Sequence, residues 1–207
     1  NELVNEDLKY LIRIFSSKTK LQNQIVKLIK NRKNVFALKE KIYCKDEKNI
    51  ADFFFEEFSK NFFIIWNKQK SQFLKNLSLI NSSVKVSDSK NTTAIEVESK
   101  LEKLKTESEL IQILNLLGEI KSLAFTEKIQ IRKRGYLKNE AASAVANEIG
   151  AAEDLMKNLY SFQIPENHQE IERELARFGK TILTFFESAL NIYEGKKKNE
   201  GFIDYED

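Results

Sequence analysis

The chain has 207 residues, of which 42% are hydrophobic and 31% charged, and its formal net charge is +3 at pH 7. This composition predicts a folded protein with a sizeable core and argues against a disordered tail. The longest apolar run, Phe62–Trp66, is far shorter than the roughly 20 residues of a membrane-spanning helix, so no membrane contact is expected. The single cysteine, Cys44, excludes an internal disulfide framework and is typical of a reducing compartment, which predicts a cytoplasmic location.

Long helices are predicted because the whole chain contains one proline and six glycines. Apolar residues recur at helical spacing over 7–15 and 21–29, and a third, short helix is expected over 35–43. The phenylalanines over 50–80 follow a 3.6-residue period, which predicts one long helix or two nearly collinear ones. The serine-rich stretch 81–93 lacks an apolar face and is expected to be a flexible linker.

The second half of the chain continues this helical pattern. A charged helix is expected over 94–105, and Thr106–Glu109 has the pattern of a capping box for the apolar helix that follows it. Residues 128–136 alternate briefly and end near a glycine, which predicts an extended segment or loop. An alanine-rich helix is expected over 140–160, and Pro165 is expected in the first turn of the last helix. The predicted fold class is all-α, an irregular multi-helix bundle with one polar linker.

The sequence lacks the motifs of several enzyme classes. It contains no G-x-x-x-x-G-K-[ST] phosphate loop, no G-x-G-x-x-G, no H-E-x-x-H and no G-x-S-x-G. One histidine, His168, and one cysteine cannot form a zinc site without carboxylate ligands, so both are interpreted as structural residues. No catalytic residue, metal ligand or cofactor is therefore predicted for this chain itself.

Two basic clusters are candidates for contact with DNA. The first lies across the second predicted helix and its exit and comprises Lys18, Lys20, Lys27, Lys30, Arg32 and Lys33. The second lies in the predicted loop and comprises Lys128, Arg132, Lys133, Arg134, Tyr136 and Lys138. Several cations near a glycine can contact phosphates, and a tyrosine among them can stack on a sugar or base. An ordinary solvated loop is the alternative interpretation, and both stay open from the residues alone.

The most specific pattern is the segment Tyr193–Asp207, which reads Y-E-G-K-K-K-N-E-G-F-I-D-Y-E-D. It resembles the segment of UvrD/Rep-type (superfamily 1) DNA helicases that re-enters the ATPase core just before the Walker B acidic motif. In that family the segment reads Y-x-x-x-K-x-x-x-G-x-[aliphatic]-D-[aromatic]-x-D. The matching residues are Tyr193, Lys197, Gly201, Ile203, Asp204, Tyr205 and Asp207. Tyr205 stands where phenylalanine is commoner.

The resemblance implies that residues 1–200 form a helical accessory subdomain similar to the 1B-type insertion of AddA/RecB helicase–nucleases, and that 201–207 begin the return to the motor core. Residues 25–32 look like the leucine-rich stretch near the start of that insertion. The parent protein would then be an ATP-dependent DNA helicase of recombinational repair, with or without exonuclease activity, that uses ATP and Mg. The implied partners are DNA, bound without sequence preference, and the rest of the motor. The resemblance also allows a second helicase–nuclease subunit.

Two other classes of function stay open. One is a free-standing helical scaffold that binds a protein partner, which a large exposed patch over Phe53–Phe63 would favour. The other is a stand-alone enzyme with an unrecognised site, against which the lack of any convergent polar motif counts. The helicase resemblance predicts that the reading frame continues past Asp207 into a hydrophobic strand and acidic residues. A stop codon at that point would contradict the helicase interpretation.

Overall fold

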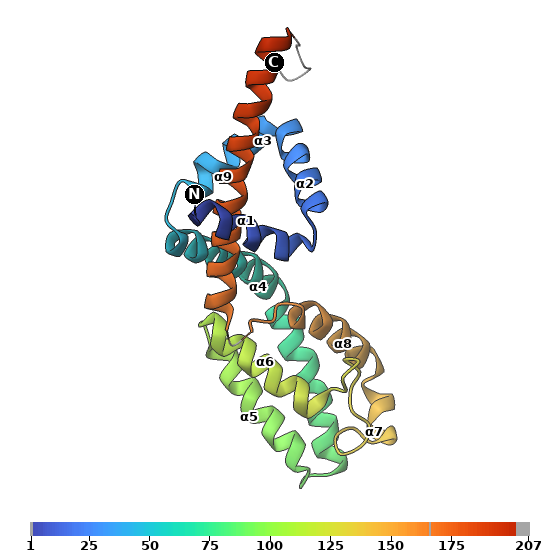
Figure 1. Ribbon diagram of the computed structural model, residues 1–207. Coiled ribbons are helices and arrows are strands. Elements are labelled where there is room, and N and C mark those ends of the chain that lie inside the picture. Colours follow the sequence, from blue (N-terminus) through green and yellow to red (C-terminus); the bar gives the residue numbers. More distant parts are fainter. Residues whose placement is uncertain (1, 166, 202–207) are drawn as a thin grey trace. The chain divides into compact units, whose positions relative to one another are not determined.

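The computed structural model describes residues 2–165 and 167–201, and these are helical almost throughout (Figure 1). The elements in chain order are α1 (Glu2–Phe15), α2 (Lys18–Lys30), α3 (Arg32–Leu38), the π-helical segment η1 (Lys39–Tyr43), α4 (Glu47–Ser87), α5 (Thr92–Thr106), α6 (Leu110–Ala124), α7 (Asn139–Ala144), α8 (Ala146–Tyr160) and α9 (His168–Glu200). Extended pairing in this part of the chain is limited to an isolated bridge between Phe125 and Ile131. The prediction of an all-α fold is confirmed.

The chain divides into two compact units. Unit 1 consists of Asn1–Glu56 and Asn167–Asp207, and unit 2 consists of Glu57–Glu166. The helix α4 is a single helix of 41 residues that belongs to both units, which confirms the prediction of a long helix over 50–80. The sequence predicted one accessory subdomain over 1–200, whereas the structure divides these residues between two units.

In unit 1, α9 is the helix on which the other elements assemble. It contacts α1, α2 and η1, and it buries an apolar stripe formed by Ile182, Leu183, Phe186 and Leu190. Leu11 of α1 and Leu21 of α2 pack with Ile182 in one cluster. Val35 of α3 packs with the rest of the stripe in another. Unit 1 therefore needs both segments of the chain, because each supplies buried residues to the two apolar clusters.

The π-helical segment η1 contacts α9 at a glycine. The backbone N–H of Cys44 donates to the carbonyl of Lys39 at 2.9 Å, the i to i−5 hydrogen bond of a π turn. The ring of Tyr43, the last residue of η1, occupies the space that a side chain at Gly179 of α9 would fill. Lys39 also forms an ion pair with Glu187 of α9. The helix predicted over 35–43 is thus correct in position, but its second half is π-helical.

In unit 2, α4 supplies one side of the core. Its buried residues there are Phe62, Trp66, Phe73, Asn76, Leu77, Ile80, Asn81 and Val84. Trp66 stacks on Phe62 with 6.1 Å between ring centroids, and Phe162 packs edge-on against Phe62 at 5.6 Å. The helix α6 packs closely against α5 and also against α8. The regularly spaced phenylalanines that predicted a helix from the sequence therefore lie, in this unit, on the face of α4 that forms the core.

The prediction of a flexible linker over 81–93 is wrong. The helix α4 continues to Ser87, α5 begins at Thr92, and the segment between them is a short turn. The polar residues of this stretch are used inside unit 2: Asn81 is 3% exposed and donates to the carbonyl of Ala94, and Ser83 donates to the carbonyl of Ala141. The polar composition of this stretch suggested that it is exposed to solvent. Its side chains instead form hydrogen bonds with backbone carbonyl groups inside unit 2.

The predicted capping box at Thr106–Glu109 is also wrong. Thr106 is the last residue of α5, and α6 begins at Leu110 without a side-chain cap. Instead, Oε1 of Glu107 accepts hydrogen bonds from the backbone N–H groups of Ser108 at 2.8 Å and Glu109 at 2.9 Å. These two bonds hold the pKa of the Glu107 carboxyl below its usual value. The chain thus turns between α5 and α6 in three residues, and Glu109 is the N-cap residue of α6 without a side-chain hydrogen bond.

Two other helix boundaries differ from expectation. The alanine-rich helix predicted over 140–160 is divided into α7 and α8, with Val145 between them. The last helix begins at His168, so Pro165 precedes it and does not lie in its first turn. The ring of His168 stacks on Phe55 with 5.4 Å between centroids, which agrees with its interpretation as a structural residue.

Candidate nucleic-acid interface

The loop between α6 and α7, residues 125–138, carries the second predicted basic cluster. It begins with the antiparallel bridge between Phe125 and Ile131, and the backbone N–H of Ile131 also donates to Oε1 of Glu153 on α8 at 2.8 Å. The expectation of an extended segment or loop over 128–136 is confirmed. Because the loop is bonded to α8 as well as joined to α6, its basic residues project from a supported backbone.

The tip of this loop holds Ile129 in a left-handed conformation, with φ of 55°. Its N–H donates to the carbonyl of Thr126 at 3.0 Å, and the N–H of Gln130 donates to Oγ1 of Thr126 at 3.2 Å. A β-branched residue at positive φ is strained, and such turn positions favour glycine or asparagine. Lys128, one of the predicted contact residues, immediately precedes the strained position.

We expect Ile129→Asn to raise the free energy of unfolding of unit 2 by about 0.5–1 kcal/mol, because asparagine adopts the left-handed conformation at less cost than isoleucine. Trp66 is the single tryptophan and is 1% exposed in the same unit, so its fluorescence during urea denaturation measures the change. Glu127→Asn, in the same turn, is the matched control and should change stability by less than about 0.5 kcal/mol. A loss of stability in Ile129→Asn would show that the contacts of the isoleucine side chain outweigh the strain.

Tyr136 lies in the core of unit 2, which corrects the expectation that it stacks on a sugar or base. Its residue is 1% exposed, and its hydroxyl donates to Oδ1 of Asn81 on α4 at 3.1 Å. Burial raises the pKa of the phenol well above its usual value, so the group stays neutral. The tyrosine therefore anchors the loop to α4 and cannot reach a nucleotide in this conformation.

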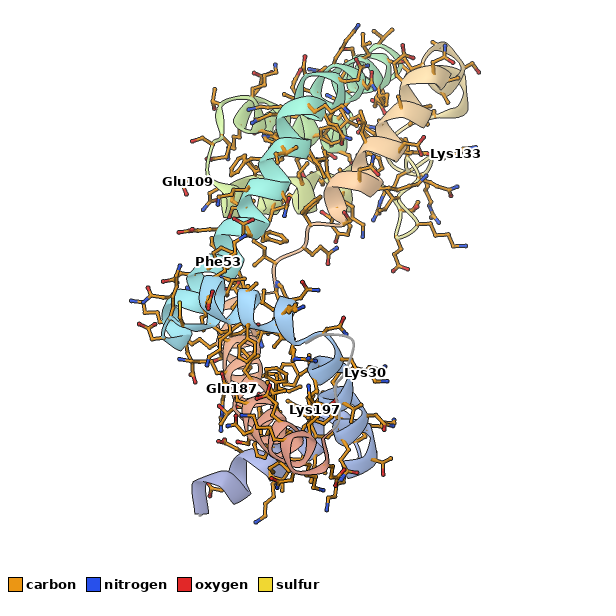
Figure 2. The ribbon with its side chains drawn as sticks, turned by 90° about the horizontal axis from the view of Figure 1, so that it is seen from above. Lys30, Phe53, Glu109, Lys133, Glu187 and Lys197 are labelled. Carbon is orange, nitrogen blue, oxygen red and sulfur yellow. The ribbon has the colours of Figure 1, made fainter. Side chains whose placement is uncertain are left out.

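The cations of the loop have different roles. Nε of Arg132 donates to the carbonyl of Phe125 at 2.7 Å and so braces the bridge. Nζ of Lys138 lies 3.4 Å from a carboxylate oxygen of Asp88, in a pair exposed enough to contribute little to stability. Three further cations are exposed and have no hydrogen bond or ion pair with the described part of the chain: Lys128, Lys133 and Arg134. Figure 2 shows Lys133 at the outer side of the loop.

A shallow hollow adjoins the loop at the first turn of α5. Its lining includes Lys90, Asn91, Gly135 and Lys138. The side chain of Asn91 caps α5 by accepting from the N–H of Ala94 at 2.9 Å, and it also donates to the carbonyl of Gly135 at 3.4 Å. The helix N-terminus and the two lysines give this region positive potential, which the carboxylate of Asp88 partly offsets.

The first basic cluster surrounds the α2–α3 junction in unit 1. Lys27, Lys30 and Lys33 are exposed (Lys30 is labelled in Figure 2), as are Lys18 and Lys20 at the start of α2. Arg32 is only 9% exposed, and its guanidinium approaches the carbonyl of Ile29 at 3.5 Å, which corrects its assignment as a DNA contact. Lys27 and Lys30 also lie in the last turn of α2, where cations stabilise the helix without any ligand.

The two predicted clusters belong to different units, the α2–α3 cluster to unit 1 and the α6–α7 loop to unit 2. Each cluster is therefore described within its own unit. Of the residues matched to the helicase pattern, Tyr193 and Lys197 lie on α9, and Gly201 ends this helix with φ of 72°. The remaining matches, Ile203, Asp204, Tyr205 and Asp207, lie outside the described residues.

A third group of cations was not found from the sequence. A hollow in unit 1 is lined by Lys9 and Arg13 of α1 and by Arg177 of α9, together with Glu6 and Tyr10. No local pattern could have indicated it, because the contributing helices lie at opposite ends of the chain. The amphipathic pattern of α1 and α9 predicted that each helix packs through its apolar face. It could not show that the two helices pack against each other.

The described residues contain no group of three or more His, Cys, Asp or Glu side chains arranged to hold a metal ion. Within the same residues, none of the helices combines the length and apolar character needed to cross a bilayer. No family model, curated protein or solved structure matched this chain in comparisons with known proteins. Its function is therefore inferred from its own residues.

Proposed function

We propose that this chain is a helical accessory subdomain of an ATP-dependent DNA helicase similar to the UvrD/Rep type, and that it contacts DNA through phosphates without sequence preference. The observation that carries the proposal is the in-register pattern from Tyr193 to Asp207. In this proposal the subdomain has no catalytic role, and the parent motor uses ATP and Mg. The parent protein, with or without an exonuclease activity, works in DNA repair, in the cytoplasm, with or without a second subunit.

The end of α9 supports the proposal. The family pattern has a glycine four residues after a lysine, and here Gly201 is the C-cap of α9, with its N–H bonded to the carbonyl of Lys197. Glycine suits this position because its φ of 72° is costly for a residue with a side chain. The helix α9 thus ends at Glu200, next to the glycine at which the proposed return to the motor core begins. The need for a glycine at the helix end explains its fixed distance from Lys197 in the pattern.

The α6–α7 loop supports the DNA contact. Lys128, Lys133 and Arg134 are exposed and unpaired within the described residues, and the backbone that carries them is held by Tyr136 and Glu153. Cations on a supported loop can approach phosphates with less loss of conformational entropy than cations on a free tail. Such contacts would be independent of base sequence and weakened by salt.

The large exposed phenylalanine patch that would favour a protein-binding scaffold is not found in the part of the chain that the structure describes. In the segment Phe53–Phe63, Phe62 is fully buried and the other phenylalanines are half-buried, so the segment does not form a large exposed patch. The rings are used in internal contacts, such as Phe54 with Tyr43 and Phe58 with Phe162. We therefore do not propose a second function.

Fluorescence anisotropy with a forked DNA, at about 50 and about 200 mM salt, tests the proposal. The variant to compare is Lys128→Ala/Lys133→Ala/Arg134→Ala, which keeps the structural Arg132 and Tyr136. If three phosphate contacts are lost, we expect binding at about 50 mM salt to weaken about a hundredfold and the salt slope to fall by about 2–3.

The matched control replaces three exposed lysines of the same unit, Lys68, Lys75 and Lys103, with alanine. It removes the same charge, and we expect binding within about threefold of wild type, because only long-range attraction is lost. Equal weakening in both variants would contradict a contact through the loop. No binding by the wild-type chain at low salt would contradict the proposed DNA contact altogether.

A further inference from the structure

The hollow between α1 and α9 gathers three cationic side chains from distant parts of the chain: Lys9, Arg13 and Arg177. We propose that it is a second phosphate-binding site, which holds one phosphodiester group of a nucleic-acid strand. This inference rests on the proposed function for the identity of the molecule that carries the phosphate. The hollow lies entirely within unit 1, whereas the α6–α7 loop lies in unit 2, so the two sites can be tested separately.

The position of Arg177 is set by an aromatic ring. Its guanidinium carbon lies 4.8 Å from the ring centroid of Tyr10, and the hydroxyl of Tyr10 lies 3.2 Å from Oε2 of Glu174. Nη1 of Arg177 is 4.0 Å from the same carboxylate, at the limit of an ion pair. Stacking thus orients the planar guanidinium, while most of its N–H donors keep no strong protein partner.

The second arginine is close by on α1. Arg13 is three residues after Tyr10 and four after Lys9, so these side chains share one face of the helix. Arg13 and Lys9 are exposed, and neither has a hydrogen bond or ion pair with the described part of the chain. Among the described residues that line the hollow, three are cationic and one, Glu6, is a carboxylate.

Phosphate suits this arrangement for two reasons. Arginine presents paired N–H donors in a plane, which matches two oxygens of a phosphate better than a lysine ammonium does. The carboxylate of Glu174 fixes Tyr10 through its hydroxyl, so the ring that supports Arg177 is itself held in place. Arg177 therefore requires little rearrangement on binding, which lowers the entropic cost of holding an anionic group.

The test measures binding of a single-stranded oligonucleotide by fluorescence anisotropy over a salt series, for wild type, Arg13→Ala, Arg13→Lys and Lys41→Ala. Arg13 is the residue to change, because Arg177 also packs on Tyr10 and its loss could disturb the fold. We expect Arg13→Ala to weaken binding about tenfold at 0.1 M salt and to lower the salt slope by about 1. Arg13→Lys should restore the slope but only part of the affinity, because it keeps the charge and loses the planar donors.

Lys41→Ala is the charge-matched control, an exposed residue of η1 in the same unit, and should bind like wild type. Circular dichroism of each variant checks that the helices are intact. If Arg13→Ala binds the oligonucleotide like Lys41→Ala, while the triple variant of the loop fails to bind, this inference is wrong and the proposed function stands.

A second measurement uses inorganic pyrophosphate and the thermal transition followed by circular dichroism. Pyrophosphate should raise the Tm of the wild-type chain and of Lys41→Ala, and should leave that of Arg13→Ala unchanged. An equal rise in the Tm of all three proteins would overturn the site.

A poly-glutamate peptide tests which anion the site prefers. If it binds the wild-type chain as tightly as the oligonucleotide does, and loses the same affinity in Arg13→Ala, the assignment of the site to nucleic acid is wrong. If the oligonucleotide does not bind the wild-type chain but pyrophosphate acts as expected, the nucleic-acid assignment and the proposed DNA contact both fail.

Discussion

Replacing Asn81 with alanine is expected to lower the free energy of unfolding of unit 2 by about 2–3 kcal/mol. The residue is 3% exposed, and its amide joins three elements: Nδ2 donates to the carbonyl of Ala94 at 3.0 Å, and Oδ1 accepts from the hydroxyl of Tyr136 at 3.1 Å. Alanine removes both bonds and leaves the tyrosine hydroxyl buried without this acceptor, which costs more than the loss of an exposed hydrogen bond. Urea denaturation followed by the fluorescence of Trp66 measures the change.

Asn67→Ala is the matched control, because Asn67 is an exposed asparagine on the same helix. Its replacement should change stability by less than about 0.5 kcal/mol. Tyr136→Phe, which removes only the hydroxyl, should cost about 1 kcal/mol, and the double variant with Asn81→Ala should show a coupling of about 1 kcal/mol between the two positions. Equal effects of Asn81→Ala and Asn67→Ala would contradict the buried network and the anchoring of the α6–α7 loop.

Gly179→Ala is expected to lower the free energy of unfolding of unit 1 by about 2 kcal/mol, although alanine is normally the better helix former. A Cβ atom at this position would lie 2.5 Å from Cζ and Oη of Tyr43 and closer still to Cε1. The ring is half-buried and packs edge-on against Phe54 at 6.5 Å, so moving it away from α9 loses contacts on both sides. The overpacking and lost contacts therefore outweigh the gain of about 1 kcal/mol in helix propensity.

The control for this variant is Gly195→Ala, in the same helix. No atom lies within 4 Å of a Cβ built at Gly195, and the residue is exposed. Here alanine should raise stability by about 0.5–1 kcal/mol, so the two substitutions have opposite signs. Because the single tryptophan lies in unit 2, unfolding of unit 1 is followed by far-ultraviolet circular dichroism. A gain in stability for both variants would show that Tyr43 does not pack against α9 as described.

The sequence by itself determined the helical class and most helix positions. The long helix α4 was predicted because phenylalanines spaced three and four residues apart fall on one face, and that spacing is local information. The loop after α6 was also predicted, since a short alternating stretch ends at Gly135, which adopts φ of 83°. Helix formation and helix breaks depend on neighbours within a few residues, and these can be read directly from the chain.

The tertiary structure decided which polar residues are exposed. Asn81 and Tyr136 were expected in a linker and on a DNA-contacting surface, but they bond to each other in the core across 55 positions of sequence. Arg177 and Tyr10 form a cationic hollow that links α1 to α9, and Tyr10 reaches Glu174 across 164 positions. A helical period tells which side of a helix is apolar, but not which distant segment will cover it. The burial of a polar side chain depends on that distant partner, so only the folded chain determines it.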